Sequence, residues 1–241
     1  MNIVQQFLPG GESVRSRLPY AGHVAQQGVL ADVLRRQIID GAFAPGSRLS
    51  ESALAERFDV SRNTLREAFR VLAEQGLLEH VPNRGVSVAA PSIADVIDIY
   101  RARRVIECTA LRQSEPEHPA VDRMREAVDA AEAAIAGASP HDHDAWRGVG
   151  SANMAFHVAL VDLADSPRLA RTYRNVAAEL RLAFLEIDDR RALHEPFVRR
   201  NRSVLTAFLE RGPHAGADEL ERYLIQSERA VLGAFARVGK S

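Results

Sequence analysis

The residues best suited to chemistry in this sequence are basic and amide side chains at helical spacing. Arg62, Arg66 and Arg70 recur every four residues. At about 100° per residue they share one side of a helix, and Asn63 lies at the edge of that side. A guanidinium group can bond guanine O6 and N7 together, and an amide can bond adenine. This face therefore fits reading of a DNA major groove, although a solvated helix face in an arginine-rich chain would give the same pattern.

Three helices are expected to build and position this face. Apolar residues between 29 and 43 recur at three- and four-residue steps, which predicts a helix that Gly41 ends. Ser50 can cap a second helix and Ser61 a third that ends near Gln75, because a serine hydroxyl accepts a free backbone N–H at a helix start. The third helix also has an apolar side, which we expect to face the core and which comprises Leu65, Ala68, Phe69 and Leu72.

A β-hairpin is predicted after the third helix. Residues 77–81 and 86–88 have the pattern of short strands, and the turn between them is Pro82-Asn83-Arg84-Gly85. Arg84 at the tip could enter a minor groove or contact phosphate. Arg48, just before the second helix, is a further candidate for a phosphate contact. The order helix, helix-turn-helix, hairpin predicts a winged helix.

The pattern changes after Pro91, and almost everything that follows is helix-periodic. Ser92 and Asp95 form a capping-box pattern at the start of this region. Prolines separate the predicted helices, which span 92–114, 119–137, 142–165, 168–189, 195–211 and 214–237. The predicted fold is mainly α, with a flexible arm at 1–25, a winged helix-turn-helix domain at 26–90 and an all-helical effector-binding and dimerisation domain at 91–241.

Composition and charge exclude several classes of protein. Hydrophobic residues make up 46% of the chain, enough for a real core, and 31 basic against 32 acidic residues leave a net charge of −1. The single cysteine, Cys108, excludes an internal disulfide and a zinc site built from several thiolates. The sequence lacks the roughly 18 consecutive apolar residues of a spanning helix. We therefore expect a cytoplasmic, nucleoid-associated protein without a membrane partner.

The N-terminal region resembles the winged helix of GntR-family bacterial repressors. The resemblance rests on four segments, GAFAPGSRLSESALA at 41–55, VSRNTLREA at 60–68, LAEQGLL at 72–78 and NRGVSV at 83–88. It implies contacts to operator DNA by Ser61, Arg62, Asn63, Thr64 and Arg66, and a wing that carries Arg84 and Gly85. With Arg48, Arg70 and Asn83, these residues form the predicted DNA-binding set.

The C-terminal region is similar to the FCD effector-binding domain that accompanies one branch of that family. Its recurrent start, an Arg four residues before a Glu, is met by Arg103 and Glu107. This spacing places both on one side of a helix, where they could form an ion pair. Alternatively, Arg103 could hold the carboxylate of an effector, because its guanidinium forms a planar fork.

The same resemblance points to a position where relatives often hold a divalent metal with one Asp and three His. The corresponding residues here are Asn153, His157, Asn201 and Tyr223, of which only His157 is a strong ligand. We therefore expect no required cofactor, with a divalent metal held at His157 as the less favoured alternative, and predict that these four side chains, with Arg103, bind an organic acid directly. They could instead be ordinary buried polar residues. A second cluster, His141-Asp142-His143-Asp144, is better explained as a solvated helix start.

Together these patterns predict a bacterial transcriptional regulator, in particular a metabolite-responsive repressor that binds a pseudo-palindromic operator as a homodimer. The basic and acidic residues between Leu30 and Val88 cancel, eight against eight, so a single head would bind DNA weakly and a dimer is favoured. One alternative makes the helical domain a dimerisation or interaction module without a ligand. Another, an enzyme based on His157, lacks a paired acid or nucleophile.

Overall fold

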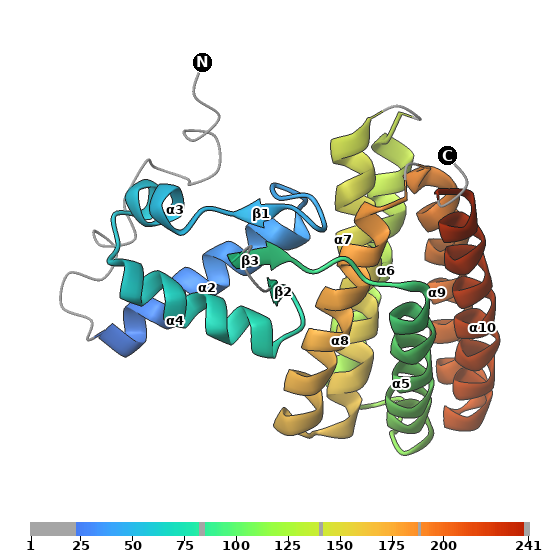
Figure 1. Ribbon diagram of the computed structural model, residues 1–241. Helices are drawn as coiled ribbons and strands as arrows, with labels where there is room; N and C mark the ends of the chain where they lie inside the picture. The colour runs from blue at the N-terminus through green and yellow to red at the C-terminus, as the bar shows by residue number, and fades with distance from the viewer. Residues whose placement is uncertain (1–22, 82–84, 140–141, 188, 239–241) are drawn as a thin grey trace. The chain divides into compact units, whose positions relative to one another are not determined.

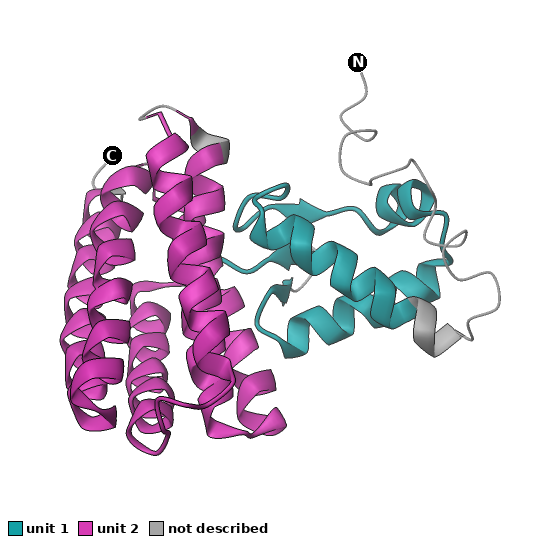
Figure 2. Ribbon diagram, turned by 180° about the vertical axis from the view of Figure 1, so that it is seen from behind, with its two compact units in different colours: residues 1–90 teal, residues 91–241 magenta. Residues whose placement is uncertain are grey.

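The computed structural model describes residues 23–81, 85–139, 142–187 and 189–238. The chain forms two compact units that meet in sequence between Ala90 and Pro91 (Figure 2). We call residues up to Ala90 the head and the remainder the bundle.

Three helices of the head have local causes that are visible in the sequence. They are α2 (His23–Ile39), α3 (Glu51–Phe58) and α4 (Arg62–Glu74). As predicted, the Ser50 hydroxyl caps α3 by accepting the Ala53 N–H at 3.3 Å. Helix α2 begins earlier than predicted, so residues 23–25 belong to a helix and not to an arm, whereas residues 1–22 lie outside the described residues. It ends at Ile39, shortly before Gly41 with φ of 77°.

A small antiparallel sheet completes the head. Its strands are β1 (Arg48–Leu49), β2 (Leu78–Val81) and β3 (Gly85–Val88), in the order β1-β3-β2. Leu49 pairs with Val86, and Leu78 pairs with Val88. The hairpin was predicted, whereas β1 was not, because two residues are too short to show alternation. Residues 82–84 of the turn lie outside the described residues.

The core of the head fixes which side of α4 is exposed. Leu65, Ala68, Phe69 and Leu72 are all buried, as their helical spacing predicted. Helix α4 packs against α2, which contributes the buried residues Leu30, Leu34 and Ile38. The opposite side of α4 therefore faces solvent with its arginines.

The bundle consists of long helices that run side by side (Figure 1). They are α5 (Ile93–Arg112), α6 (Ala120–Gly137), α7 (His143–Val161), α8 (Pro167–Leu185), α9 (Arg190–Arg211) and α10 (Pro213–Val238), with the short 3₁₀ helix η2 (Asp162–Ala164) after α7. The predicted Ser92–Asp95 capping box is present at the start of α5. Helix α9 starts five residues earlier than its predicted start at 195, because Asp189 caps it, so Pro196 lies inside the helix.

Helix α7 occupies the middle of the bundle and so determines where buried polar groups meet. It packs against α5, α6, α8 and α9, while α10 packs against α5 and α9. A side chain that points inward from α7 can therefore reach residues on several other helices. Within the described part of the chain, no helix is both long enough and apolar enough to span a bilayer.

Candidate functional site

The start of α4 presents an exposed arginine and an exposed amide. Arg62 and Asn63 are exposed, as predicted. The Ser61 hydroxyl accepts the Thr64 N–H at 3.0 Å, so its main contact is a helix cap. Thr64 differs from the prediction: it is buried, and its hydroxyl oxygen lies 2.8 Å from that of Ser61. It lies about 200° around the helix from Arg62, next to the apolar side, and supports the fold there.

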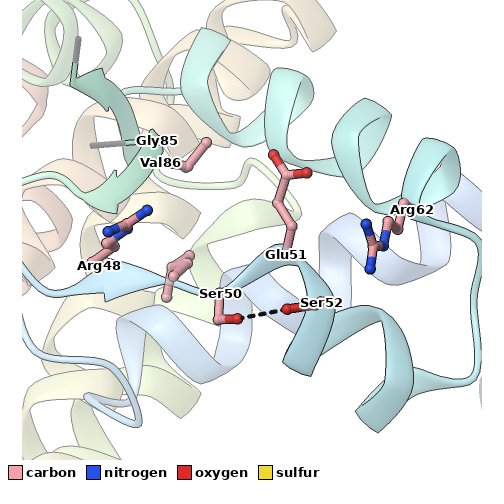
Figure 3. A pocket seen from close by; sticks show the side chains of 8 residues that line it. Arg48, Ser50, Glu51, Ser52, Arg62, Gly85 and Val86 are labelled. Atoms are coloured by element: carbon pink, nitrogen blue, oxygen red, sulfur yellow. Dashed lines mark hydrogen bonds between the residues drawn. The ribbon is translucent and has the colours of Figure 1, made fainter. Parts of the chain in front are cut away.

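A hollow of about 540 Å³ adjoins this helix start. Its lining comprises Arg48, Leu49, Ser50, Glu51, Ser52, Arg62, Gly85 and Val86. Figure 3 shows Arg48 and Arg62 on opposite sides of the hollow, with Ser50, Glu51 and Ser52 between them. Strand β1, helix α3, helix α4 and the wing strand β3 thus converge on one surface that carries two serine hydroxyls and the Glu51 carboxylate and is bounded by two cations.

Ion pairs divide the head's predicted DNA-binding arginines into two groups. Arg66 Nε donates to Glu51 Oε2 at 2.8 Å, which links α4 to α3. Arg70 contacts Glu67 at 3.2 Å and Glu74 at 2.6 Å, and these carboxylates raise its pKa. Among the described residues, neither Arg48 nor Arg62 has an acidic partner within ion-pair distance. Arg48 and Arg62 are therefore the cations most available to a polyanion.

The wing is only partly described. Asn83 and Arg84 lie outside the described residues. Gly85, the first residue of β3, has φ of +85°, a conformation that other residues adopt with strain. A glycine here lets the chain leave the turn and pair with β2.

A second constellation lies inside the bundle, where seven polar side chains meet. We call it the Glu107 cluster. Its members come from α5, α7, α8, α9 and α10 and are Arg103, Glu107, Asn153, His157, Tyr173, Asn201 and Tyr223, all buried. The five residues predicted to bind an effector are thus in one region of the bundle. Glu107 was considered only as a partner of Arg103, and Tyr173 was not predicted, because nothing in its local sequence marks it.

The Glu107 carboxylate is the acceptor at the centre of the cluster. Arg103 Nε–H and the Tyr173 hydroxyl both donate to Oε1 at 2.7 Å. The third donor is His157 Nδ1, 2.7 Å from Oε2. Burial alone would raise the pKa of Glu107, but Arg103 and His157 outweigh it and lower that pKa to about 2. Glu107 is therefore ionised at neutral pH.

The imidazole of His157 is neutral and has one defined tautomer. Burial lowers the pKa of His157 despite the nearby carboxylate. Because ionised Glu107 can only accept, the proton of His157 is on Nδ1. Its Nε2 then accepts a hydrogen bond from the Tyr223 hydroxyl at 2.9 Å. Burial also raises the pKa of Tyr223, so this hydroxyl keeps its proton.

Two polar atoms of the cluster have no hydrogen-bond partner. Asn201 Nδ2 donates to Asn153 Oδ1 at 2.6 Å, which leaves Asn201 Oδ1 buried and unpartnered. Arg103 contacts Glu107 through Nε and lies over the Tyr100 ring at 5.1 Å, yet its Nη2 is also buried and unpartnered. Arg103 is thus an ion-pair partner that retains one donor for something else.

This donor set does not fit a divalent metal. Both nitrogens of His157 are engaged, and Asn153 Oδ1 already accepts a hydrogen bond. Among the described residues, no group of three or more His, Cys, Asp or Glu side chains could hold a metal ion. Of the alternative cluster at 141–144, His141 and the side chains of His143 and Asp144 lie outside the described residues.

Comparison with known families places each constellation in a defined domain. Residues 26–88 match the family described as bacterial regulatory proteins, gntR family. Residues 98–226 match the FCD domain. The first match contains α4 and the hollow, and the second contains every member of the Glu107 cluster.

Individual relatives agree with these assignments. A GntR protein of Rhodococcus sp. RHA1 has a solved structure that is 38% identical, with a TM-score of 0.80, covering 87% of this chain and 99% of that one. The regulator YdhC of Bacillus subtilis is 30% identical over 59% of this chain and 62% of its own length. The repressor RspR of Escherichia coli is 44% identical over 34% of this chain and 36% of its own length. Both curated relatives are thus matched over less than two thirds of their length, and both are named as regulators of transcription, not as enzymes.

Proposed function

Because the chain belongs to the gntR family of bacterial regulatory proteins and carries an FCD domain, we propose that it is a DNA-binding repressor controlled by a small organic acid. The observation that carries the DNA-binding role is the exposed start of α4, where Arg62 and Asn63 project beside the hollow that Arg48 flanks. A recognition helix meets base edges with its N-terminal residues. This part of α4 is the one with the most available charge.

Each head residue then has a distinct role on DNA. Arg62 reads a base, for which a guanidinium is suited when it bonds guanine O6 and N7 together. Arg48 and the free backbone N–H groups at the start of α4 bind phosphate. Arg66 approaches DNA with its Nε already held by Glu51, so its remaining N–H groups are oriented in advance. Arg70, bonded to two carboxylates, lies one turn further along and contributes less.

The charge of the head favours a homodimer. The head has no excess of basic residues, because the eight between Leu30 and Val88 are balanced by eight acidic ones. Phosphate neutralisation supplies most non-specific affinity, so one such head binds weakly. Two heads on half-sites one helical turn apart combine two weak contacts into a specific one.

The Glu107 cluster is the effector site in this proposal. A buried site that recognises an acid needs a cationic donor without a full set of partners, and Arg103 Nη2 is such a donor. The residues present support direct binding without a metal. The unpartnered atoms of Arg103 and Asn201 favour a ligand here, because buried polar atoms are costly to leave unpaired.

Selection of bound sequences from random duplex DNA tests the DNA-binding role and requires no defined operator. The wild-type protein should enrich an inverted repeat. Arg62→Ala should lower affinity for the enriched duplex by about 1–3 kcal/mol and relax the preference at one base of each half-site. Arg229→Ala is a matched control, because Arg229 is exposed on α10 in the bundle.

Three results would count against the proposal. In the first, the wild-type protein enriches no sequence. In the second, Arg62→Ala enriches the same sequences as wild type. In the third, Arg229→Ala loses as much affinity for the enriched duplex as Arg62→Ala does. A uniform loss on all sequences would instead reassign Arg62 to phosphate binding.

A further inference from the structure

We infer that the outer surface of α5 and α8 binds the same surface of a second copy of this chain, with the two α5 helices antiparallel and Val105 at the two-fold axis. This inference rests on the homodimer in the proposed function and specifies the surface that forms it. It follows from the positions of exposed aliphatic and charged side chains on these two helices of the bundle (Figure 1).

Large aliphatic side chains that face solvent are confined to α5 and α8 among the described residues. They are Ile93 with 49% of its surface exposed, Val105 with 70% and Leu169 with 41%. One exposed aliphatic side chain is ordinary, whereas several on neighbouring elements mark a binding surface. Helices α5 and α8 pack against each other. Ile93 is the first residue of α5, so Val105 and Leu169 form the centre of this surface.

Helix α8 runs antiparallel to α5, which places Leu169 beside the second half of α5. Just after α5, His118 Nε2 lies 3.2 Å from Oδ2 of Asp165, which comes just before α8. At the other end, Glu179 of α8 interacts electrostatically with Asp98 near the start of α5. The start of α8 and the end of α5 are therefore neighbours.

Val105 lies within an exposed line of side chains along α5. Ala94, Asp98, Arg101, Val105 and Thr109 are all exposed. Their spacing of three and four residues places them on one side of the helix. The distance between packed helices depends on the side chains at the contact. The small side chains of Ala94 and Thr109 therefore allow another helix to approach this line.

Charges of opposite sign occupy the two ends of the surface. Asp98 and Glu179 form the acidic end. Arg168, near the start of α8, is exposed at the other end and has no acidic partner within ion-pair distance in the described part of the chain. Arg112, the last residue of α5, contacts two carboxylates of α10 at 3.3 Å. Arg168 is thus the main cation of the basic end, and the apolar centre lies between the two ends.

Such a surface is complementary to itself. A two-fold axis makes residue i of one copy meet residue j of the other, and j meet i. With the axis at Val105 and the α5 helices antiparallel, the acidic end of each copy faces the basic end of the other, and the two Val105 side chains meet. Parallel helices would bring like charges together, which is unfavourable. An unrelated partner would require no such symmetry, so the pattern favours a second copy.

Analytical ultracentrifugation of the full-length protein tests the inference. Wild type should sediment as a dimer. Val105→Glu places two carboxylates in an apolar contact at the axis, so it should raise the dissociation constant of the dimer by about 100-fold or more. Ala130→Glu is the matched control, because it adds the same charge at an exposed position of α6. This control should remain as dimeric as wild type.

A cysteine variant tests the position of the axis without adding charge. The one native cysteine, Cys108, is buried, and burial raises the pKa of its thiol to about 12. Wild type should therefore resist cross-linking by diamide. Val105→Cys should give a covalent dimer on a non-reducing gel, because two side chains at a two-fold axis come within reach of a disulfide. Ala130→Cys should not.

The charged ends predict a smaller effect that depends on salt. Arg168→Glu should raise the dissociation constant about fivefold at low salt and less at high salt, since salt screens exposed charges. An unchanged or tighter dimer would overturn the antiparallel arrangement.

Three results would overturn the inference and leave the homodimer of the proposed function intact. In the first, Val105→Glu dimerises as tightly as wild type. In the second, Ala130→Glu weakens the dimer as much as Val105→Glu does. In the third, Val105→Cys is not cross-linked. A monomeric wild type would overturn both the inference and the homodimer, and the selection experiment on random DNA would still test the head.

Discussion

The head and the bundle each contain an Arg followed four residues later by a Glu on the same helix, and the two pairs behave differently. Arg70 and Glu74 lie 2.6 Å apart with 61% and 62% of their side chains exposed. Arg103 and Glu107 lie 2.7 Å apart with 2% and 0% exposed. The two pairs thus have the same spacing and nearly the same distance, and they differ in exposure to solvent, which decides what each pair can do.

The exposed pair can exchange partners, because water and salt compensate for its separation. A phosphate group can replace Glu74 next to Arg70 at little cost. The buried pair cannot exchange partners in this way, since an isolated charge in the bundle would lose its hydration without compensation. Among the described residues of the head, no charged side chain is buried. The head is therefore built for reversible contact with a polyanion, and the bundle for a fixed pattern of donors and acceptors.

The largest effect is expected from neutralising the buried carboxylate. Glu107→Gln leaves Arg103 as an uncompensated buried charge, so the bundle should lose about 3–5 kcal/mol of unfolding free energy. Urea titration followed by tryptophan fluorescence measures this, because the one tryptophan of the chain, Trp146, is buried in α7.

Glu74→Gln is the matched control on α4 and should unfold like wild type. If Glu107→Gln proved as stable as Glu74→Gln, the distinction between the two pairs would be lost.

The next effect concerns pH. His157 and His194 are both buried in the bundle, and burial lowers their pKa values from 6.5, that of His194 to about 3 with help from Arg181 and Arg190. Between pH 6.5 and 3 the unfolded chain binds protons that the folded bundle does not, so unfolding free energy falls as pH falls. His194 should cost about 2 kcal/mol at pH 5 relative to pH 7.5, and His157 should add a loss in the same direction.

Glu107 extends this acid sensitivity. Its pKa is lowered from 4.5 to about 2, so its stabilising contribution is present above pH 4.5 and is lost as pH falls toward 2. The Trp146 signal should therefore report a bundle that weakens steadily on acidification. A Trp146 transition whose urea midpoint does not move between pH 7.5 and 5 would show that these histidines are not buried in neutral form.

A smaller effect is expected where α9 and α10 approach each other. A Cβ at Gly216 would lie 2.7 Å from Phe208 Cβ and 2.9 Å from Phe208 Cα, so Gly216→Ala must push the backbones apart. We expect a loss of about 1–3 kcal/mol by the same urea titration. The substitution would also move α10, which carries Tyr223, relative to α9, which carries Asn201.

Gly233 supplies the control on the same helix. A Cβ there would have its nearest contact at 3.9 Å, so Gly233→Ala should stabilise α10 by up to about 1 kcal/mol through helix propensity. If Gly216→Ala and Gly233→Ala changed the free energy of unfolding equally, close packing of α10 against α9 would not be the cause of the change.

The elements of the head could be predicted from the sequence because their causes are local. Ser50 and Ser61 each cap the helix that they precede, at contacts only three residues long. Ser92 caps the first helix of the bundle in the same way. The exposed and buried sides of α4 also followed from periodicity, except at Thr64. Thr64 lies at the border between the two sides, where its own contact with Ser61 decided its orientation.

The buried site could be predicted only in part. The four-residue spacing of Arg103 and Glu107 indicated a shared helix side, and the structure adds their tertiary partners. His157 lies 50 residues from Glu107 in the sequence, and Tyr173 lies 66 residues from it. No local sequence pattern predicts contacts between residues so far apart. The direction of the hydrogen bonds, and hence the acceptor left on Asn201, depends on all of these contacts together.

The central claim is that an acid in the bundle changes how the head binds DNA. The most direct test measures the affinity of the full-length protein for its selected duplex, by fluorescence anisotropy, with and without a saturating concentration of an organic acid that binds the protein in a calorimetric screen. The account predicts a change of about 5- to 150-fold for wild type, the usual range of coupling between two sites, and a loss of this change in Asn201→Leu. Identical affinity of the wild-type protein with and without the bound acid would contradict it.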